Sequence, residues 1–157
     1  MINKYFLFFL LFPAFCFGEL FLEITKGSED PFRVALIPLK ESDNFSKKIN
    51  KIIVNDLTRT GEFYILDEDL LLSLETTEED INYSDWKLLG VDYVVSIYTV
   101  KINNSIDLKY EIYDVYNKKK IRSSTVFGIP KQIRQLAHYT SDGIYESISG
   151  IKGIAST

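Results

Sequence analysis

The stretch from Tyr93 to Tyr98 constrains the fold of this chain more than any other. Five of its six residues are β-branched or aromatic, which favours a β-strand. Because it is apolar at almost every position rather than at every second one, we expect a central strand that is covered on both faces. In front of it, Ser84 is positioned to cap a short helix that carries Trp86, the only tryptophan, and Gly90 is positioned to end that helix.

Hydrophobic spacing places further elements on both sides of this strand. Residues 33–38 are apolar at almost every position and predict an interior strand, whereas residues 63–66 predict a short one. Apolar side chains recur every three or four positions over 45–57 and again over 133–148, which is the spacing of one face of an α-helix. Gly150 follows the second helix and is expected to end it.

Two more strands are expected after the central one, joined by turns at Asn103-Asn104 and at residues 117–120. Together the three strands predict an antiparallel meander. Within residues 106–112, apolar and polar side chains alternate, which predicts one buried and one exposed face. The side chains expected on the exposed face are Asp107, Lys109 and Glu111.

The order of these elements predicts an α/β fold. The simplest arrangement is a two-layer sandwich, in which two main helices lie on one face of a mixed β-sheet that includes the meander. The other face of the sheet is expected to be partly exposed. A chain of 157 residues that is 46% hydrophobic has room and apolar material for about one ordinary domain.

The balance of charge argues against nucleic acid as a partner. The chain has a formal net charge of -4 and a pI near 5.1. A protein that binds phosphates electrostatically needs clustered Lys and Arg to displace counterions. The acidic excess therefore indicates protein partners or none.

The first segment predicts export. An apolar run from Tyr5 to Phe17 has the length of a signal-peptide core and is too short to span a bilayer comfortably. Cleavage that removes residues 1–18 starts the mature chain at Glu19. The alternative is a lipoprotein signal acylated at Cys16, although Phe15 stands where that peptidase prefers a small residue. We expect no stable membrane insertion after signal cleavage.

His138, Ser141 and Asp142 are the only grouping that resembles a catalytic set. His138 and Asp142 are one helical turn apart and can touch. However, a nucleophile normally lies at a sharp turn or helix start with oxyanion donors nearby, whereas Ser141 lies inside a predicted helix. We expect helix capping and surface hydrogen bonding instead, and no catalytic residues. One His and no mature Cys cannot form a structural zinc site, and no phosphate-binding glycine loop is present, so no metal or cofactor is expected.

The segment from Glu19 to Thr25 predicts a peripheral strand, with Leu20, Leu22 and Ile24 on one face. An edge strand offers unpaired N–H and C=O groups with which another chain can pair. Two interpretations remain open from the residues alone. The strand binds a partner, or it merely completes the sheet.

Several short runs, taken in this order, resemble the amino-terminal domain of the TolB family, a periplasmic component of the Tol-Pal envelope system. The resemblance extends from the mature terminus to the last residue. The runs are Glu-Leu-Phe-Leu-Glu-Ile-Thr-Lys-Gly at 19–27, Val-Ala-Leu-Ile-Pro-Leu at 34–39, Asp-Leu-Thr-Arg-Thr-Gly-Glu-Phe at 56–63, Asp-Trp-Lys-Leu-Leu-Gly-Val-Asp-Tyr at 85–93, the set His138, Ser141 and Asp142, and Ser-Gly-Ile-Lys-Gly-Ile-Ala-Ser-Thr at 149–157.

The resemblance implies a non-enzymatic adaptor in the periplasm. In the family, an α/β domain is joined to a β-propeller that binds the lipoprotein Pal. Residues 19–149 then correspond to the α/β domain, and residues 150–157 to a linker toward a propeller that is absent from this chain. Pal would be reached only through that missing propeller, and the chain is expected to be a fragment or a natural truncation.

The resemblance also implies a partner surface. In the family, the segment just after the signal peptide is linked to binding the C-terminal domain of TolA. The implied role is coupling across the envelope for outer-membrane integrity, cell division and protein import. The alternative is a structural envelope domain that supports a cell-wall synthase or a secretion assembly. Mapped onto this chain, the partner-binding residues are Glu19, Leu20, Phe21, Leu22, Glu23 and Ile24.

Overall fold

The computed structural model describes residues 30–37, 44–71, 81–102 and 104–156. The described strands are β1 (Phe32–Ile37), β2 (Phe63–Ile65), β3 (Tyr93–Ile102), β4 (Ser105–Asp114) and β5 (Lys119–Gly128). The described helices are α1 (Asn44–Arg59), α2 (Tyr83–Leu88) and α3 (Ile133–Ser149), together with the short 3-10 helices η2 (Glu68–Leu70) and η3 (Pro130–Gln132). Among the described residues, no helix is long and apolar enough to cross a membrane.

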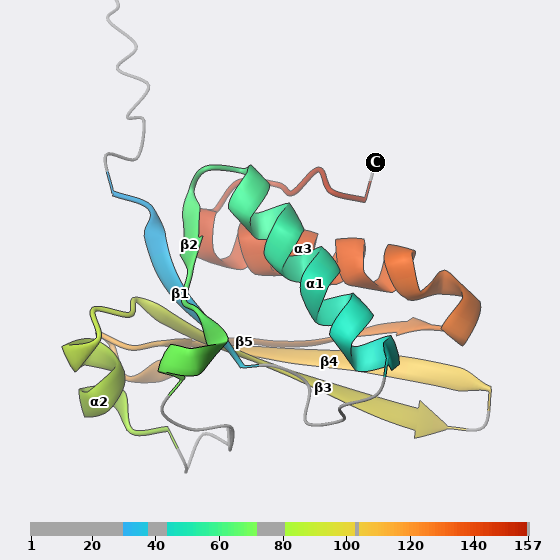
Figure 1. The fold of residues 1–157 in the computed structure, drawn as a ribbon, viewed down its shortest axis with the longest axis horizontal. Helices are drawn as coiled ribbons and strands as arrows, with labels where there is room; N and C mark the ends of the chain where they lie inside the picture. The colour runs from blue at the N-terminus through green and yellow to red at the C-terminus, as the bar shows by residue number, and fades with distance from the viewer. Residues whose placement is uncertain (1–29, 38–43, 72–80, 103, 157) are drawn as a thin grey trace, which may run out of the picture.

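The strands form one mixed sheet in the order β2-β1-β3-β4-β5. β1 pairs in parallel with both β2 and β3, and the β3, β4 and β5 strands form the antiparallel meander. β3 is therefore the central strand, as predicted, and its Val94 and Val95 are fully buried on opposite faces. The main helices α1 and α3 lie together on one face of the sheet (Figure 1), which confirms the predicted two-layer α/β fold.

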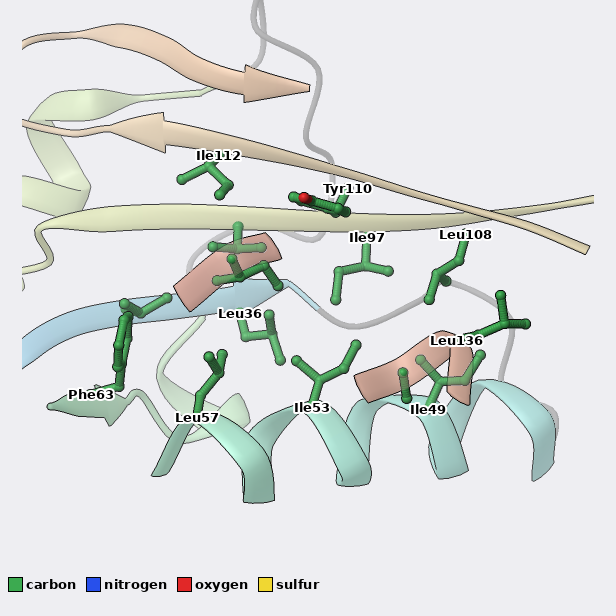
Figure 2. Close-up of a cluster of buried hydrophobic side chains, with 14 of the residues drawn as sticks. Leu36, Ile49, Ile53, Leu57, Phe63, Ile97, Leu108, Tyr110, Ile112 and Leu136 are labelled. Carbon is green, nitrogen blue, oxygen red and sulfur yellow. The ribbon is translucent and has the colours of Figure 1, made fainter. Parts of the chain in front are cut away.

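The main core fills the space between the sheet and these two helices. It forms because α1 and α3 each bury an apolar stripe at helical spacing and β4 buries every second side chain. Figure 2 shows the stripe of α1 pointing toward the inner side chains of the sheet. The residues labelled there are Leu36, Ile49, Ile53, Leu57, Phe63, Ile97, Leu108, Tyr110, Ile112 and Leu136.

A second buried cluster covers one end of the opposite face of the sheet. Trp86 of α2 is 2% exposed there and packs with Val94 of the central strand and Tyr113 of β4. The other buried members are Ala35, Ile37, Leu66, Ile81, Val91 and Val115. This face, which was expected to be partly exposed, is thus closed at the end where α2 lies.

The helix α2 begins two residues earlier than the predicted cap implies. Asn82, not Ser84, is the N-cap residue, because the Asn82 side chain accepts a hydrogen bond from the Ser84 backbone N–H at 3.2 Å. The Asn82 amide also donates to Asp85 at 2.7 Å. The end of the helix follows the prediction, since Gly90 adopts a φ of 68°.

The prediction that Glu111 faces solvent is wrong. Glu111 is only 7% exposed. Its carboxylate accepts hydrogen bonds from the Tyr113 hydroxyl at 2.7 Å and from the Ser123 hydroxyl at 3.1 Å. The Lys109 ammonium lies 2.9 Å from the same carboxylate. Burial alone would raise the pKa of Glu111, but these hydrogen bonds and the Lys109 charge lower it to about 2. A bulge between Ile112 and Tyr113 accompanies this change of environment.

Gly143 lies where α3 meets Tyr110 of β4. A Cβ atom at position 143 would contact the Tyr110 hydroxyl and would lie 2.9 Å from the ring Cζ, too close for two carbon atoms. Alanine favours a helix interior over glycine by up to about 1 kcal/mol, whereas overpacking a core costs about 1–3 kcal/mol. Because the clash outweighs the helix propensity, we expect Gly143→Ala to lower the free energy of unfolding by about 2 kcal/mol in urea titrations followed by circular dichroism.

The same substitution in a Tyr110→Phe background provides the control. Phenylalanine lacks the hydroxyl that makes the closest approach, so the cost of Gly143→Ala should become smaller in that background. Equal costs in both backgrounds would show that Tyr110 is not the source of the strain.

Candidate functional site

The predicted partner segment, Glu19 to Ile24, lies outside the residues that the structure describes, as do the predicted signal peptide and Cys16. The candidate catalytic set on α3 lies entirely within the described residues. We therefore built the candidate site from His138, Ser141 and Asp142 outward.

His138 and Ser141 converge on a carboxylate from α1 rather than on Asp142. The His138 Nδ1 atom lies 2.6 Å from Asp56 Oδ2, and the Ser141 hydroxyl lies 3.0 Å from the same oxygen. An ionised carboxylate only accepts hydrogen bonds, so Nδ1 carries a proton. The Ser141 hydroxyl also lies 2.9 Å from the backbone carbonyl of Ala137. These contacts join α1 to α3.

Asp56 is the member of this cluster that sequence reasoning missed. Its side chain is only 7% exposed because it lies beside the buried stripe of α1, three residues after Ile53. A carboxylate on the inward side of an amphipathic helix needs a partner when it is buried. The inward position of Asp56 on the predicted helix indicated that its carboxylate would need a partner. It could not identify that partner as His138, which lies 82 residues away.

Asp142 anchors the segment that follows α3. Gly150 ends the helix with a φ of 74°, and its N–H donates to the Glu146 carbonyl at 3.0 Å. The chain then turns back, and the Asp142 carboxylate accepts hydrogen bonds from the backbone N–H groups of Ala155 at 2.6 Å and Ser156 at 2.9 Å. Although His138 and Asp142 are one helical turn apart, the His138 side chain bonds to Asp56, and the Asp142 carboxylate bonds to the returning segment.

Gly153 makes this return possible. A Cβ atom at position 153 would lie 2.6 Å from the Cα and 2.7 Å from the Cβ of Asp142. Backbone cannot move away from such a contact as the end of a flexible side chain can. A residue without a side chain is therefore required where the segment crosses α3.

A groove of about 590 Å³ lies between the end of α1, the middle of α3 and the returning segment. Its floor includes Asp56, Ser141 and Asp142, and its rim includes the exposed residues Arg59 and Lys152. Tyr145 also lines it. Burial and the neighbouring Glu62 carboxylate raise the pKa of Tyr145.

The cluster does not form a Ser-His-Asp relay. In such a relay the histidine accepts the serine proton, whereas here both His138 and Ser141 are bonded to Asp56. Ser141 lines the groove but is only 1% exposed, so little of its surface is accessible from there. The arrangement fits a structural anchor that joins α1, α3 and the C-terminal segment.

Comparison with known proteins identifies the family to which this chain belongs. The family model of the TolB amino-terminal domain matches residues 20–121. The Tol-Pal system protein TolB of Alcanivorax borkumensis is 33% identical over 141 residues, which cover 89% of this chain and 32% of that protein. The chain spans about a third of the length of the curated relatives it matches. These relatives are named for the system to which they belong and for no enzymatic activity.

Solved structures agree with this match. The crystal structure of TolB from Acinetobacter baumannii has a TM-score of 0.70 and 28% identity, covering 81% of this chain and 30% of that one. The LpoB C-terminal domain from Salmonella enterica has a TM-score of 0.51 at 16% identity, covering 66% of this chain and 87% of that one, a likeness of fold alone. From its sequence and its fold, the chain belongs to the TolB amino-terminal domain family.

Proposed function

We propose that this protein is a periplasmic binding module of the Tol-Pal system. It would take part, through protein contacts, in coupling across the envelope that maintains the outer membrane and supports cell division and protein import. The family match over residues 20–121 carries this proposal. The relatives that match most of the chain are named as Tol-Pal system proteins, which supports the same role. In this proposal, residues 1–18 are a signal peptide that directs export.

The proposed partner is the C-terminal domain of TolA, bound by the backbone of Glu19 to Ile24. The family match begins at Leu20, so this segment falls within the domain that defines the family. If this segment is an edge strand, as its sequence predicts, it can pair with another chain as an added strand at little cost to folding.

Deleting Glu19 to Leu22 tests this partner surface. We expect titration calorimetry with the TolA C-terminal domain to show no measurable binding, because the deletion removes most of the pairing strand. The free energy of unfolding should change by less than about 0.5 kcal/mol, as for other changes outside the core. A matched control replaces residues 26–29 with Gly-Ser-Gly-Ser and should keep its affinity. Full affinity after the deletion would refute the assignment.

We propose that this domain reaches Pal only through a propeller and not through its own surface. In this proposal, residues 19–149 form the binding domain and residues 150–157 connect it to a propeller of the kind found in longer family members. The backbone N–H groups of Ala155 and Ser156 donate hydrogen bonds to the Asp142 carboxylate. These bonds support a connection that leaves the domain in a defined direction.

A further inference from the structure

We propose a second protein-binding surface at the free edge of β5, where an acidic, extended segment of a partner protein adds a strand to the sheet. This surface is separate from Glu19 to Ile24 and does not depend on the proposed role of that segment. β5 ends the sheet on the side opposite β2. Over its ten residues, the described part of the structure pairs it only with β4.

The length of this edge makes it suitable for strand addition. Each unpaired strand presents a row of N–H and C=O groups along its outer side. At about 3.3 Å per residue, β5 offers an edge of roughly 30 Å, whereas β2 at the other side has only three residues. A partner segment bound here gains its affinity from backbone hydrogen bonds, and its specificity from the side chains that flank the edge.

Positive charge gathers at the start of this edge. Lys118, Lys119 and Arg122 are exposed, and their side chains have no hydrogen bond or ion pair with any described residue. Lys109 and Lys120 lie nearby on the paired strands, and both approach Glu111, which is buried. Lys109 and Lys120 thus approach the buried Glu111, while Lys118, Lys119 and Arg122 add three exposed basic groups at the start of β5, in a chain whose net charge is -4.

The positive charge at the β5 edge favours an acidic partner segment over a second copy of this chain. Basic side chains on an edge strand oppose pairing with a second basic strand, which is how proteins avoid association through their edges. In a symmetric antiparallel pair of β5 strands, the basic start of each strand would lie beside the apolar end of the other, where it meets no complementary charge. An acidic segment instead meets complementary charge here, while the net negative charge repels it from the rest of the protein.

The other end of the edge offers an apolar contact. Phe127 is 74% exposed and pairs in register with Asp107 of β4, which in turn pairs with Val100 of β3. Paired residues share one face of a sheet, so Phe127 and the 49% exposed Val100 flank Asp107 on the same face. The fitting partner segment is therefore acidic at one end and carries an aliphatic or aromatic side chain near the other.

The test uses fluorescent peptides of about ten residues with Glu alternating with Thr and Val, titrated into the mature protein and followed by polarisation. We expect Lys119→Glu with Arg122→Glu to weaken binding more than about ten-fold, since each reversal removes one ion pair and adds a repulsion. The matched control, Lys47→Glu with Lys48→Glu, makes the same charge change on exposed residues of α1. It should alter affinity less than about two-fold.

Two further measurements separate strand addition from charge alone. Binding should slow hydrogen exchange at β5 amides, and a peptide N-methylated at every second residue should not bind, because it cannot pair with the edge. Equal weakening by both charge-reversal pairs would overturn the proposal, as would unchanged exchange at β5. A change of oligomeric state on adding peptide, with unchanged exchange at β5, would also count against it.

Discussion

Trp86→Ala is expected to lower the free energy of unfolding by about 3–5 kcal/mol, the usual cost of truncating a buried aromatic side chain. Trp86 is 2% exposed and is the largest member of the cluster that closes one end of the outer sheet face. Its loss leaves a cavity against Val94 and Tyr113, which belong to the two strands at the centre of the sheet. Those strands cannot collapse into the space without breaking their pairing, so the cavity should persist.

Urea denaturation followed by far-UV circular dichroism measures this loss, because the variant lacks the only tryptophan. Leu88→Ala is the matched control on the same helix. Leu88 is 86% exposed, so its truncation should change stability by less than about 0.5 kcal/mol. Similar losses for both variants would mean that α2 contributes through helix formation and not through the buried indole.

Glu111 should make stability depend on pH below the usual range of carboxyl titration. Its pKa is lowered in the folded protein from an ordinary value of 4.5 to about 2. A lowered pKa means that the folded state favours the ionised form, so its stabilisation is present above pH 4.5 and is lost as the pH falls toward 2. The shift corresponds to about 3 kcal/mol.

The comparison of wild type with Glu111→Gln isolates this contribution from that of the other carboxyl groups. The difference in unfolding free energy should be largest near neutral pH and should shrink by about 3 kcal/mol between pH 5 and pH 2. Glu146→Gln, the same exchange at an exposed position of α3, is the matched control. A pH-independent difference for Glu111→Gln would contradict the lowered pKa.

Sequence periodicity was sufficient to predict the helices and strands whose apolar spacing has only one interpretation. The stripe Ile49, Ile53 and Leu57 predicted α1, and the continuous apolar run around Val95 predicted a central strand; both are confirmed. Gly90 and Gly150 were also correctly identified as helix ends. These features depend on the local backbone and on which face of an element is apolar, and both are encoded within a few neighbouring residues.

Features that depend on contacts between distant elements were not predictable in this way. The alternation around Glu111 suggested an exposed face, but Tyr113, Ser123 and the approach of α2 place that carboxylate in a buried network. The choice of Asn82 over Ser84 as helix cap depended on where the chain enters α2. Sequence spacing within one helix showed only that His138 and Asp142 can touch, and it could not show that His138 bonds to Asp56 on another helix.

The sequence by itself determined the class of fold and the family, because apolar periodicity and short motifs are local properties of the chain. The tertiary structure alone decided how the polar residues pair. The crossing of α1 over α3 brings Asp56 to His138 and Ser141, 82 and 85 residues away, and the turn after Gly150 brings backbone N–H groups to Asp142. A hydrogen bond needs two atoms within about 3 Å, and only the packing of the whole domain sets that distance.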